Sequence, residues 1–339
     1  MRISYRTRQF YRRLFRLILA VILAALVVLL CWVLWLRRFI IYTEDGAKID
    51  FSLSQQWPQG QTGPEIRPVV QPDIYYTDPE TPDIPDAPTV RFEGCYVTVD
   101  DLLEDLDAVR TKLLSLPEGT PVMLDVKGYR GRFYYSTATG APTSPSFDMA
   151  VMDAFFDAVN QAGLYTIARL PAFRDYQFAA EHNSAGLATA GGYLWVDGNR
   201  IYWLDPANDM VLTNLIDIAK ELRDMGFDEV AFQDFCFPDT NEIVYDGDRA
   251  QALEKAAKTL ATACATESFA VSFITSAGAP MALPEGNCRL YITDAAAYDV
   301  PEAIARLEPA TAARAVFFTS SYDTRFDNYG VIRPYKMMQ

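Results

Sequence analysis

Residues 226–238 of this chain read Gly226-Phe-Asp-Glu-Val-Ala-Phe-Gln-Asp-Phe-Cys-Phe-Pro238. The amphipathic run over residues 209–225 predicts a helix that ends at the glycine, because glycine commonly closes helices. Residues 229–233 predict a strand, which ends before Pro238 because proline cannot donate to a sheet ladder. This order is typical of parallel α/β proteins, whose functional residues lie at the carboxyl ends of the strands.

The same alternation continues on both sides of this stretch. Six further strands are expected, at residues 90–98, 122–127, 164–170, 269–275, 289–293 and 315–319. The alternation covers about 250 residues, the typical size of a (β/α)8 TIM-like barrel. No Gly-x-Gly-x-x-Gly turn follows the first strand, which disfavours a doubly wound sheet. For the eighth strand two alternatives stay open: residues 322–339 either close the barrel or leave it incomplete at the C-terminus.

The N-terminal segment has the pattern of a membrane anchor. Residues 17–36 are all apolar, and at about 1.5 Å per residue they span roughly 30 Å, the thickness of a bilayer's hydrocarbon core. Six arginines precede this segment and two follow it, which predicts a cytoplasmic N-terminus. A cleaved signal peptide is the alternative, but Cys31, Trp32 and Trp35 occupy the place of its small-residue cleavage site. We therefore expect a single-pass protein of the cell membrane with an extracytoplasmic C-terminal domain.

Composition divides the chain into four parts: an arginine-rich cytoplasmic tail (1–16), a transmembrane helix (17–36), an extracytoplasmic linker (37–88) and the barrel domain (89–339). Eight prolines between residues 58 and 88 predict an extended, semi-rigid spacer. The net charge is −14 although the first 38 residues hold eight arginines and no acid. The barrel domain is therefore strongly acidic, which argues against a nucleic-acid partner, since such binding relies on clustered Lys and Arg.

Composition also excludes several kinds of site. The single histidine, His182, lies in a long segment without helical periodicity, where a solvated surface role is expected. A zinc site built on several histidines is therefore excluded, and a Ser-His-Asp triad would have to use His182. No two of the five cysteines have metal-ligand spacing, so we expect no metal and no cofactor. A Cys95–Cys236 disulfide stays open, because it requires neighbouring strands.

Carboxylates remain as candidates for catalysis, and glycoside hydrolysis commonly needs only two of them. In the strand at 122–127, the apolar residues share one side, so Asp125 and Lys127 should point into the barrel near its mouth. They form either part of a site or a structural ion pair. Arg169, at the end of the next strand, has a planar fork that suits a carboxylate or a sugar hydroxyl. Asp205 precedes a helix and is either a substrate ligand or a turn residue.

In the strand at 229–233, Glu229, Ala231 and Gln233 share one side. The small alanine and the polar glutamine suit the barrel interior better than Phe232 does. Strict alternation then directs Asp234 outward, unless the strand has begun to turn at that residue. Asp234 is accordingly either a catalytic carboxylate or a loop-start residue.

Between about residues 90 and 275 a series of short stretches occurs in a fixed order: Met123-Leu-Asp-Val-Lys127, Gly131-Arg-Phe-Tyr-Tyr135, Tyr165-Thr-Ile-Ala-Arg-Leu-Pro-Ala-Phe-Arg-Asp175, Trp203-Leu-Asp-Pro206, Ile218-Ala-Lys-Glu-Leu222, Gly226-Phe-Asp-Glu-Val230 and Phe237-Pro238. In this series the chain resembles a bacterial envelope family of membrane-anchored proteins that are classed as glycoside hydrolases of unassigned activity. The resemblance implies a TIM barrel. The C-terminal part, including the connection 293–301, matches the family poorly.

The chain departs from the family pattern in and just after the strand expected at residues 229–233. Gln233 stands where the family has aspartate, Asp234 where it has tyrosine, and Cys236 where it has arginine. Gly128 and Tyr129 replace an acidic residue after the lysine of the second strand. Because an amide cannot protonate a glycosidic oxygen, Gln233 can only bind or orient a ligand. Either Asp234 has taken over the acid's role or catalysis has been lost.

Two functions therefore stay open. The first is a membrane-anchored, extracytoplasmic glycoside hydrolase acting on cell-envelope polysaccharide, with Asp125 and Asp234 as the acid pair and Glu229 as the alternate. The expected substrate-binding residues are Lys127, Arg169, Asp205, Gln233, Trp195 and Trp203, the tryptophans stacking on sugar rings. The second is a barrel that has lost catalysis and serves as a glycan-binding or scaffold protein of the envelope. In both cases the partner is a polysaccharide or glycan.

Overall fold

The computed structural model describes residues 40–43, 46–49 and 92–338. The chain divides into two units, Met1–Ile84 and Pro85–Gln339. In the first, β1 (Ile40–Thr43) pairs antiparallel with β2 (Gly46–Ile49). The predicted membrane span at 17–36 and the proline-rich stretch at 58–88 lie outside the described residues. Within the described ranges, no helix is both long and apolar enough to cross a bilayer.

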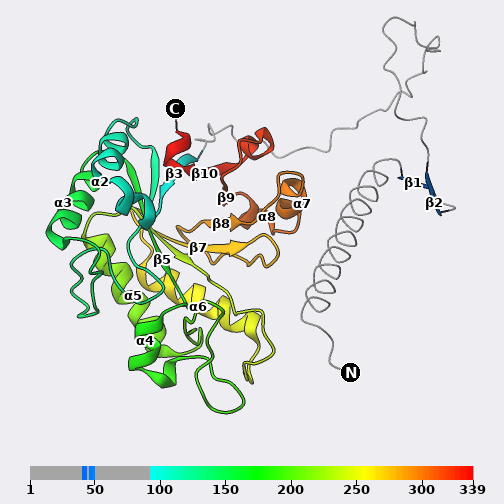
Figure 1. The fold of residues 1–339 in the computed structure, drawn as a ribbon, viewed down its shortest axis with the longest axis horizontal. Helices are drawn as coiled ribbons and strands as arrows, with labels where there is room; N and C mark the ends of the chain where they lie inside the picture. The colour runs from blue at the N-terminus through cyan, green and yellow to red at the C-terminus, as the bar shows by residue number, and fades with distance from the viewer. Residues whose placement is uncertain (1–39, 44–45, 50–91, 339) are drawn as a thin grey trace, which may run out of the picture. The chain divides into compact units, whose positions relative to one another are not determined.

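The second unit is a closed barrel of parallel strands, which confirms the predicted fold (Figure 1). Neighbouring strands follow the order β10-β3-β4-β5-β6-β7-β8-β9 around the barrel. The strands are β3 (Glu93–Val97), β4 (Pro121–Asp125), β5 (Tyr165–Pro171), β6 (Glu229–Gln233), β7 (Ala270–Ser276), β8 (Leu290–Thr293), β9 (Ala315–Phe318) and β10 (Gly330–Pro334). The tail thus closes the barrel, because β10 pairs with both β9 and β3.

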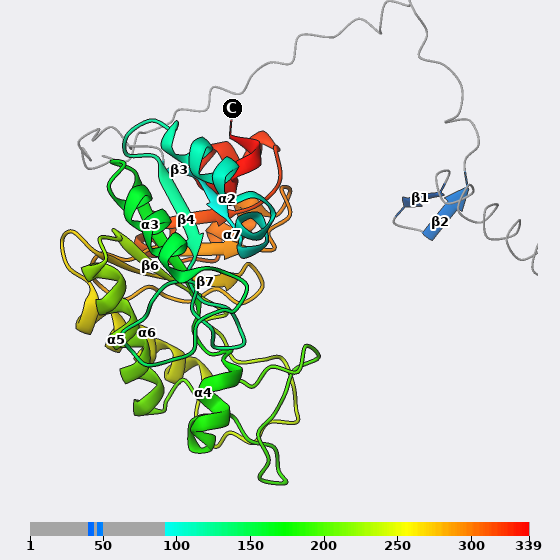
Figure 2. The same ribbon diagram turned by 60° about the vertical axis from the view of Figure 1, so that its left-hand side comes forward.

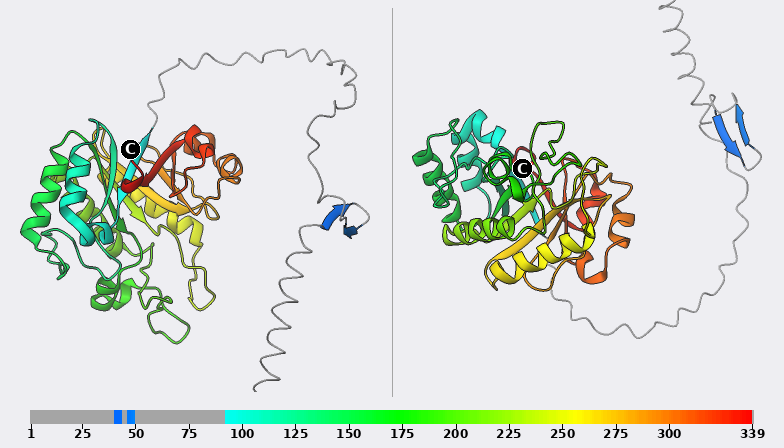
Figure 3. Two further views of the ribbon diagram at one scale, coloured as in Figure 1. Left: turned by 45° about the horizontal axis from the view of Figure 1, so that its top comes forward. Right: turned by 90° about the horizontal axis from the view of Figure 1, so that it is seen from below.

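Helices cover the outside of the strands. They are α2 (Val99–Leu114), α3 (Met149–Asn160), α4 (Tyr176–Glu181), α5 (Asp209–Asp224), α6 (Arg249–Cys264), α7 (Val300–Ala305) and α8 (Pro309–Ala312). Figure 3 shows α5 and α6, which contact each other, lying along the barrel wall. The long helices α2, α3, α5 and α6 follow strands β3 to β6, whereas β8 is followed only by the short α7 and α8.

The two faces of each strand pack in different hydrophobic cores. The barrel interior is filled by one residue from each of seven strands: Met123, Ile167, Ala231, Ile274, Tyr291, Val316 and Ile332. The alternate residues, such as Val122, Leu124 and Val230, belong to the larger core between strands and helices. Because side chains alternate, Asp125, Arg169 and Gln233 lie on the interior side, two residues closer to the carboxyl end than the interior layer. The predicted parity of β4 and β6 is therefore confirmed.

The long segment at 171–208 is more regular than the sequence suggests. It contains α4, which is only six residues long, too short for a periodic pattern to be recognised. Backbone bridges join Arg174 to Trp203 and Val196 to Tyr202, so the segment folds back on itself. Figure 2 shows it extending from the barrel as a loop-rich lobe around α4.

The cysteines of the barrel unit form no disulfide. Cys95, Cys236, Cys264 and Cys288 are free thiols. Cys95 lies in β3, and Cys236 follows β6, which is separated from β3 by β4 and β5. The strand order therefore rules out a Cys95–Cys236 disulfide. Burial raises the pKa of the Cys95 thiol to about 12.

Candidate active site

At the carboxyl ends of β4 and β5, Asp125 and Arg169 form an ion pair inside the barrel mouth. Arg169 Nε donates to Asp125 Oδ1 at 2.6 Å, and the Val99 backbone N–H donates to Asp125 Oδ2 at 2.9 Å. The guanidinium carbon lies 5.1 Å from the Phe318 ring centre and 5.8 Å from that of Tyr96. Burial opposes the charge on Arg169, but the Asp125 carboxylate outweighs it, so the pKa of Arg169 is raised. Asp125 is thus a carboxylate held in a fixed orientation.

Lys127 does not pair with Asp125, so the alternative that these two residues form a structural ion pair with each other is wrong. Its Nζ contacts Asp175 Oδ2 instead, and both side chains are only 3% exposed. Asp175 Oδ1 also accepts from the Phe178 N–H at 2.9 Å and so caps α4. Because it lies just beyond the end of β4, Lys127 reaches the loop that follows β5. Lys127 anchors that loop through its ion pair, and its side chain has little exposed surface left to contact a substrate.

Asp234 turns back toward the barrel mouth instead of following the alternation of β6. Its φ is +51°, in the left-handed region, which asparagine and aspartate enter more readily than other non-glycine residues. The side chain lies beside Arg174, with Oδ2 3.5 Å from Arg174 Nη1. Among the described residues, this buried oxygen has no hydrogen-bond partner. The turn that sequence reasoning left open is therefore present.

The pKa of the Asp234 carboxyl group lies above its ordinary value. Burial raises the pKa of the carboxyl group, and the Arg174 charge and the nearby Tyr129 oppose this shift only in part. A carboxyl group with a raised pKa is the usual form of a general acid near neutral pH. The side chain nonetheless keeps a quarter of its surface exposed, so a ligand can reach it.

Tyr129 and Arg174 complete this group, and sequence reasoning did not identify either as a site residue. The Arg174 guanidinium carbon lies 4.1 Å from the Tyr129 ring centre, and Nη2 donates to Asp197 Oδ2 at 2.6 Å. The Tyr129 hydroxyl accepts a hydrogen bond from Gln233 Nε2. Burial, and then the Asp234 charge, raise the pKa of Tyr129. The only sequence signals are that Tyr129 replaces the family's acid and that Arg174 lies within a family motif.

A cavity of about 520 Å³ opens next to this group. Tyr129 and Arg174 line it, so it adjoins the residues that contact Asp234. Hydroxyl-bearing residues Tyr134, Ser144 and Ser146 form much of the remaining wall. The opening thus presents guanidinium, phenol and hydroxyl groups, and its lining residue Arg174 also contacts Asp234.

Three other predicted residues are held by their neighbours. Trp203 is 7% exposed, and its indole N–H donates to Asp197 at 3.3 Å, so it has little open ring surface for a sugar. Trp195 is half-buried, and its indole N–H donates to Glu242 at 2.7 Å. Asp205 Oδ1 accepts from the Ala207 N–H at 2.8 Å. Asp205 therefore stabilises the turn before α5, as the turn alternative proposes.

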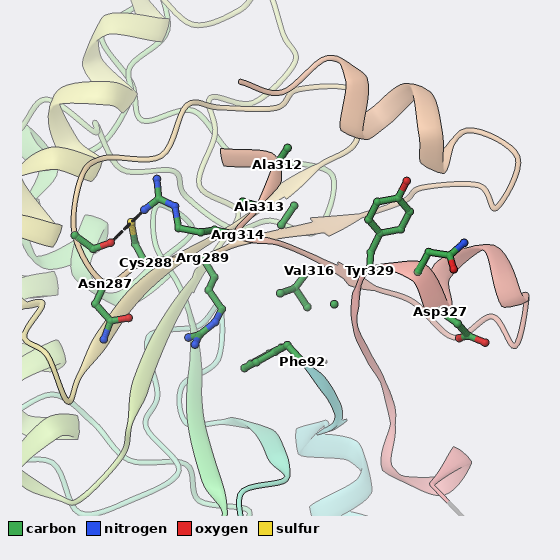
Figure 4. Close-up of a pocket in the computed structure, with 14 residues that line it drawn as sticks. Phe92, Asn287, Cys288, Arg289, Ala312, Ala313, Arg314, Val316, Asp327 and Tyr329 are labelled. Carbon is green, nitrogen blue, oxygen red and sulfur yellow. Dashed lines mark hydrogen bonds between the residues drawn. The ribbon is translucent and has the colours of Figure 1, made fainter. Parts of the chain in front are cut away.

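Glu229 lies at the opposite end of the barrel from Asp125, because it is the first residue of β6 and Asp125 is the last of β4. It is fully buried, accepts hydrogen bonds from Tyr165 and Tyr291 at 2.8 Å each, and pairs with Arg289. Arg289 also lines a larger cavity of about 670 Å³ at this amino-terminal end, where its side chain points toward Phe92 (Figure 4). Glu229 therefore does not join Asp125 and Asp234.

Carboxylates and histidines do not cluster elsewhere in a way that suggests a metal centre. In the described part of the chain, no group of three or more His, Cys, Asp or Glu is placed to hold a metal ion.

Comparison with protein families gives a match over residues 94–277 to a family described as "Putative glycosyl hydrolase domain". The matched segment begins in β3 and ends just after β7, and it is more than half of the chain. It includes Asp125, Arg169, Arg174 and Asp234. The C-terminal strands β8 to β10 lie outside it, in line with the poor resemblance expected there. No curated protein matches the chain.

Among solved structures, a hypothetical protein from Ruminiclostridium thermocellum is 20% identical with a TM-score of 0.43, covering 52% of this chain and 96% of that one. A family 36 α-galactosidase from Geobacillus stearothermophilus is 12% identical with a TM-score of 0.47, covering 74% of this chain but only 40% of the galactosidase. The glycoside hydrolase domain of PelA from Pseudomonas aeruginosa is 13% identical with a TM-score of 0.38, covering 59% and 66%. Likenesses of this size carry no functional argument.

Proposed function

Because the chain belongs to this family of glycosyl hydrolase domains, we propose that it is a membrane-anchored, extracytoplasmic glycoside hydrolase that acts on cell-envelope polysaccharide. The observation that carries the catalytic part is Asp234, a carboxyl group at the barrel mouth with a raised pKa, a quarter of whose side-chain surface is exposed. The anchor and the location are proposed from residues 17–36 and the arginines around them. A C-terminal domain that stays on the cytoplasmic side of intact cells would contradict this orientation.

In this proposal Asp234 is the general acid that protonates the glycosidic oxygen of the leaving group. Asp125, held by Arg169 and the Val99 N–H, is the second carboxylate. It acts either as nucleophile or as base toward water, depending on stereochemistry. Tyr129, Arg174 and Gln233 hold the substrate beside Asp234. Lys127 supports the loop through its ion pair with Asp175.

A non-catalytic glycan-binding barrel is the second candidate, and Gln233 is the observation that favours it. Gln233 occupies the interior end of β6, and its amide is bonded to the Tyr129 hydroxyl. An amide at that position binds and orients but does not transfer a proton to a glycosidic oxygen. In this version the mouth keeps its affinity for a glycan without cleaving it.

The decisive experiment is release of reducing ends from purified envelope polysaccharide by the full-length protein in detergent. We expect Asp234→Asn and Asp125→Asn each to lower the rate by about 10²-fold or more, since general acid–base catalysis contributes roughly that much. Asp209→Asn is the matched control, because Asp209 is exposed in the first turn of α5. It should leave the rate unchanged.

Binding measurements separate the two candidates. No release from any polysaccharide tested, combined with glycan binding that survives Asp234→Asn, would replace the hydrolase by the binding protein. Gain of hydrolysis in Gln233→Asp, with unchanged binding, would identify a barrel that has lost its acid. Rates equal to wild type in both aspartate variants would rule out the proposed acid pair.

A further inference from the structure

The cavity beside Asp234 has an unusual charge for this protein. Three arginines, Arg130, Arg132 and Arg174, are among the residues that line it, and no aspartate or glutamate is. The chain as a whole carries a net charge of −14. Positive charge therefore gathers at this opening, and its lining residue Arg174 contacts the proposed acid, Asp234. We call this opening the arginine pocket.

The donors of the arginine pocket are largely unoccupied by protein partners. Among the described residues, Arg130 is exposed and has no ion-pair or hydrogen-bond partner. Arg132 donates only to the Thr143 carbonyl, at 3.2 Å. Arg174 is half-buried between Asp197 and Asp234, and its Nε, which is buried, has no hydrogen-bond partner in the described part of the chain. A buried guanidinium N–H without a partner normally finds one in a ligand or in water.

The exposed arginines of the pocket suit an acidic ligand. Arg130 and Arg132 lie on the exposed rim of the same pocket, where a planar guanidinium binds a carboxylate through two parallel hydrogen bonds. The serine and tyrosine hydroxyls of the wall suit the remaining sugar hydroxyls.

We propose that the arginine pocket is a subsite for a sugar unit bearing a carboxylate, a uronate, with Arg130 and Arg132 binding its charge. As an assignment of substrate class this rests on the proposed function, and it makes the substrate an acidic polysaccharide. The overall negative charge of the protein repels such a polymer. The arginine pocket makes the electrostatic potential locally positive, so the charged sugar unit is bound near Asp234.

The test uses isothermal titration calorimetry on the full-length protein in detergent. The probes are trimers of galacturonate, glucuronate and mannuronate, each paired with its methyl ester, which keeps the ring and linkage but removes the charge. We expect at least one acid to bind about tenfold or more tightly than its ester, the effect of one or two charge-assisted hydrogen bonds. The double variant Arg130→Gln/Arg132→Gln should abolish this preference. Arg110→Gln, an exposed arginine of α2 outside the pocket, should preserve it.

Equal affinity for acid and ester in all three pairs would overturn the inference, as would a preference that survives the double variant. Failure of the inference and failure of the proposed function give different results. Hydrolysis of envelope polysaccharide without any binding preference for uronates would contradict the subsite but support the hydrolase. Charge-selective binding that depends on Arg130 and Arg132, without cleavage, would support the subsite but contradict the hydrolase.

Discussion

At Asp234, one backbone angle changes which side of the strand a carboxyl group faces. With a φ of +51°, the residue leaves the extended conformation of β6 and brings its side chain to Arg174. The phenylalanines on either side of Gln233-Asp234, Phe232 and Phe235, are both buried in the core, which fixes the position of the turn. A non-glycine residue in this region lowers the folding stability by roughly 1–3 kcal/mol. Such a conformation persists only where the surrounding structure imposes it.

The raised pKa of Asp234 gives a prediction for the pH profile of hydrolysis. A general acid must be protonated, so kcat/KM should fall as pH rises through the folded-state pKa of Asp234, which lies above the ordinary value of 3.8. The same sign holds for stability. The unfolded chain releases this proton at lower pH, so native stability declines between the unfolded and the folded pKa and is constant above it. Asp234→Asn should remove both dependences, measured by kcat/KM and by urea unfolding across pH.

If the Asp234→Asn variant keeps the alkaline limb of the wild-type pH profile, the general acid is another group. Asp323 offers a control, because hydrogen bonds from Arg325 lower the pKa of its carboxyl group rather than raise it, and 30% of its side-chain surface is exposed. Asp323→Asn should leave the alkaline limb unchanged.

Among the elements, β5, β6 and β8 are joined at the amino-terminal end of the barrel by one carboxylate. Glu229 begins β6, Tyr165 begins β5 and Tyr291 lies in β8, and both hydroxyls donate to Glu229. Arg289, just before β8, adds the opposite charge. Burial, followed by the Glu229 charge, raises the pKa of Tyr291, so its hydroxyl stays a donor. This network explains a fully buried acid without assigning it catalysis.

Glu229→Gln should therefore lower stability and leave catalysis per folded molecule intact. Removing the charge leaves Arg289 without its carboxylate, and breaking a largely buried pair costs about 3 kcal/mol. Glu302→Gln is the matched control, since its pair with Arg306 in α7 is exposed on both sides and should be worth less than about 0.5 kcal/mol. Urea unfolding gives both values. Loss of hydrolysis with unchanged stability would instead restore Glu229 as a catalytic candidate.

At the scale of the whole barrel unit, closure depends on a strand near the end of the chain. β10 pairs with β9 and with β3, so the last strand in sequence lies beside the first strand of the barrel. Val331 and Ile332 of β10 are completely buried, Val331 against the α7 side and Ile332 in the barrel interior. Closure also brings Phe318, at the end of β9, to Tyr96 of β3, where their stacked rings support Arg169.

A chain that stops after Tyr329 should fail to form a stable barrel. It exposes the edges of β3 and β9 and loses two fully buried aliphatic side chains, each worth about 1.5–3 kcal/mol. Together with the lost ladder hydrogen bonds, this is comparable to the roughly 5–15 kcal/mol that stabilises a typical native protein. We expect loss of near-UV circular dichroism and rapid proteolysis, whereas removal of Gln339 alone should change neither. A truncated protein with native spectra would show that the barrel folds without closure.

The sequence by itself determined the barrel class, seven of its strands and the inward parity of Asp125 and Gln233, because alternation with period two and amphipathic helices are local patterns. It did not determine which charges pair. Lys127 is two residues from Asp125 yet pairs with Asp175, and Arg174 meets Asp234 across 60 positions, since such contacts depend on where separate loops meet above the barrel. Only the tertiary structure decided the turn at Asp234, the burial that raises its pKa and the gathering of Arg130, Arg132 and Arg174 around one cavity. Desolvation and ion pairing are properties of a three-dimensional neighbourhood, so they cannot be read from a strand's own residues.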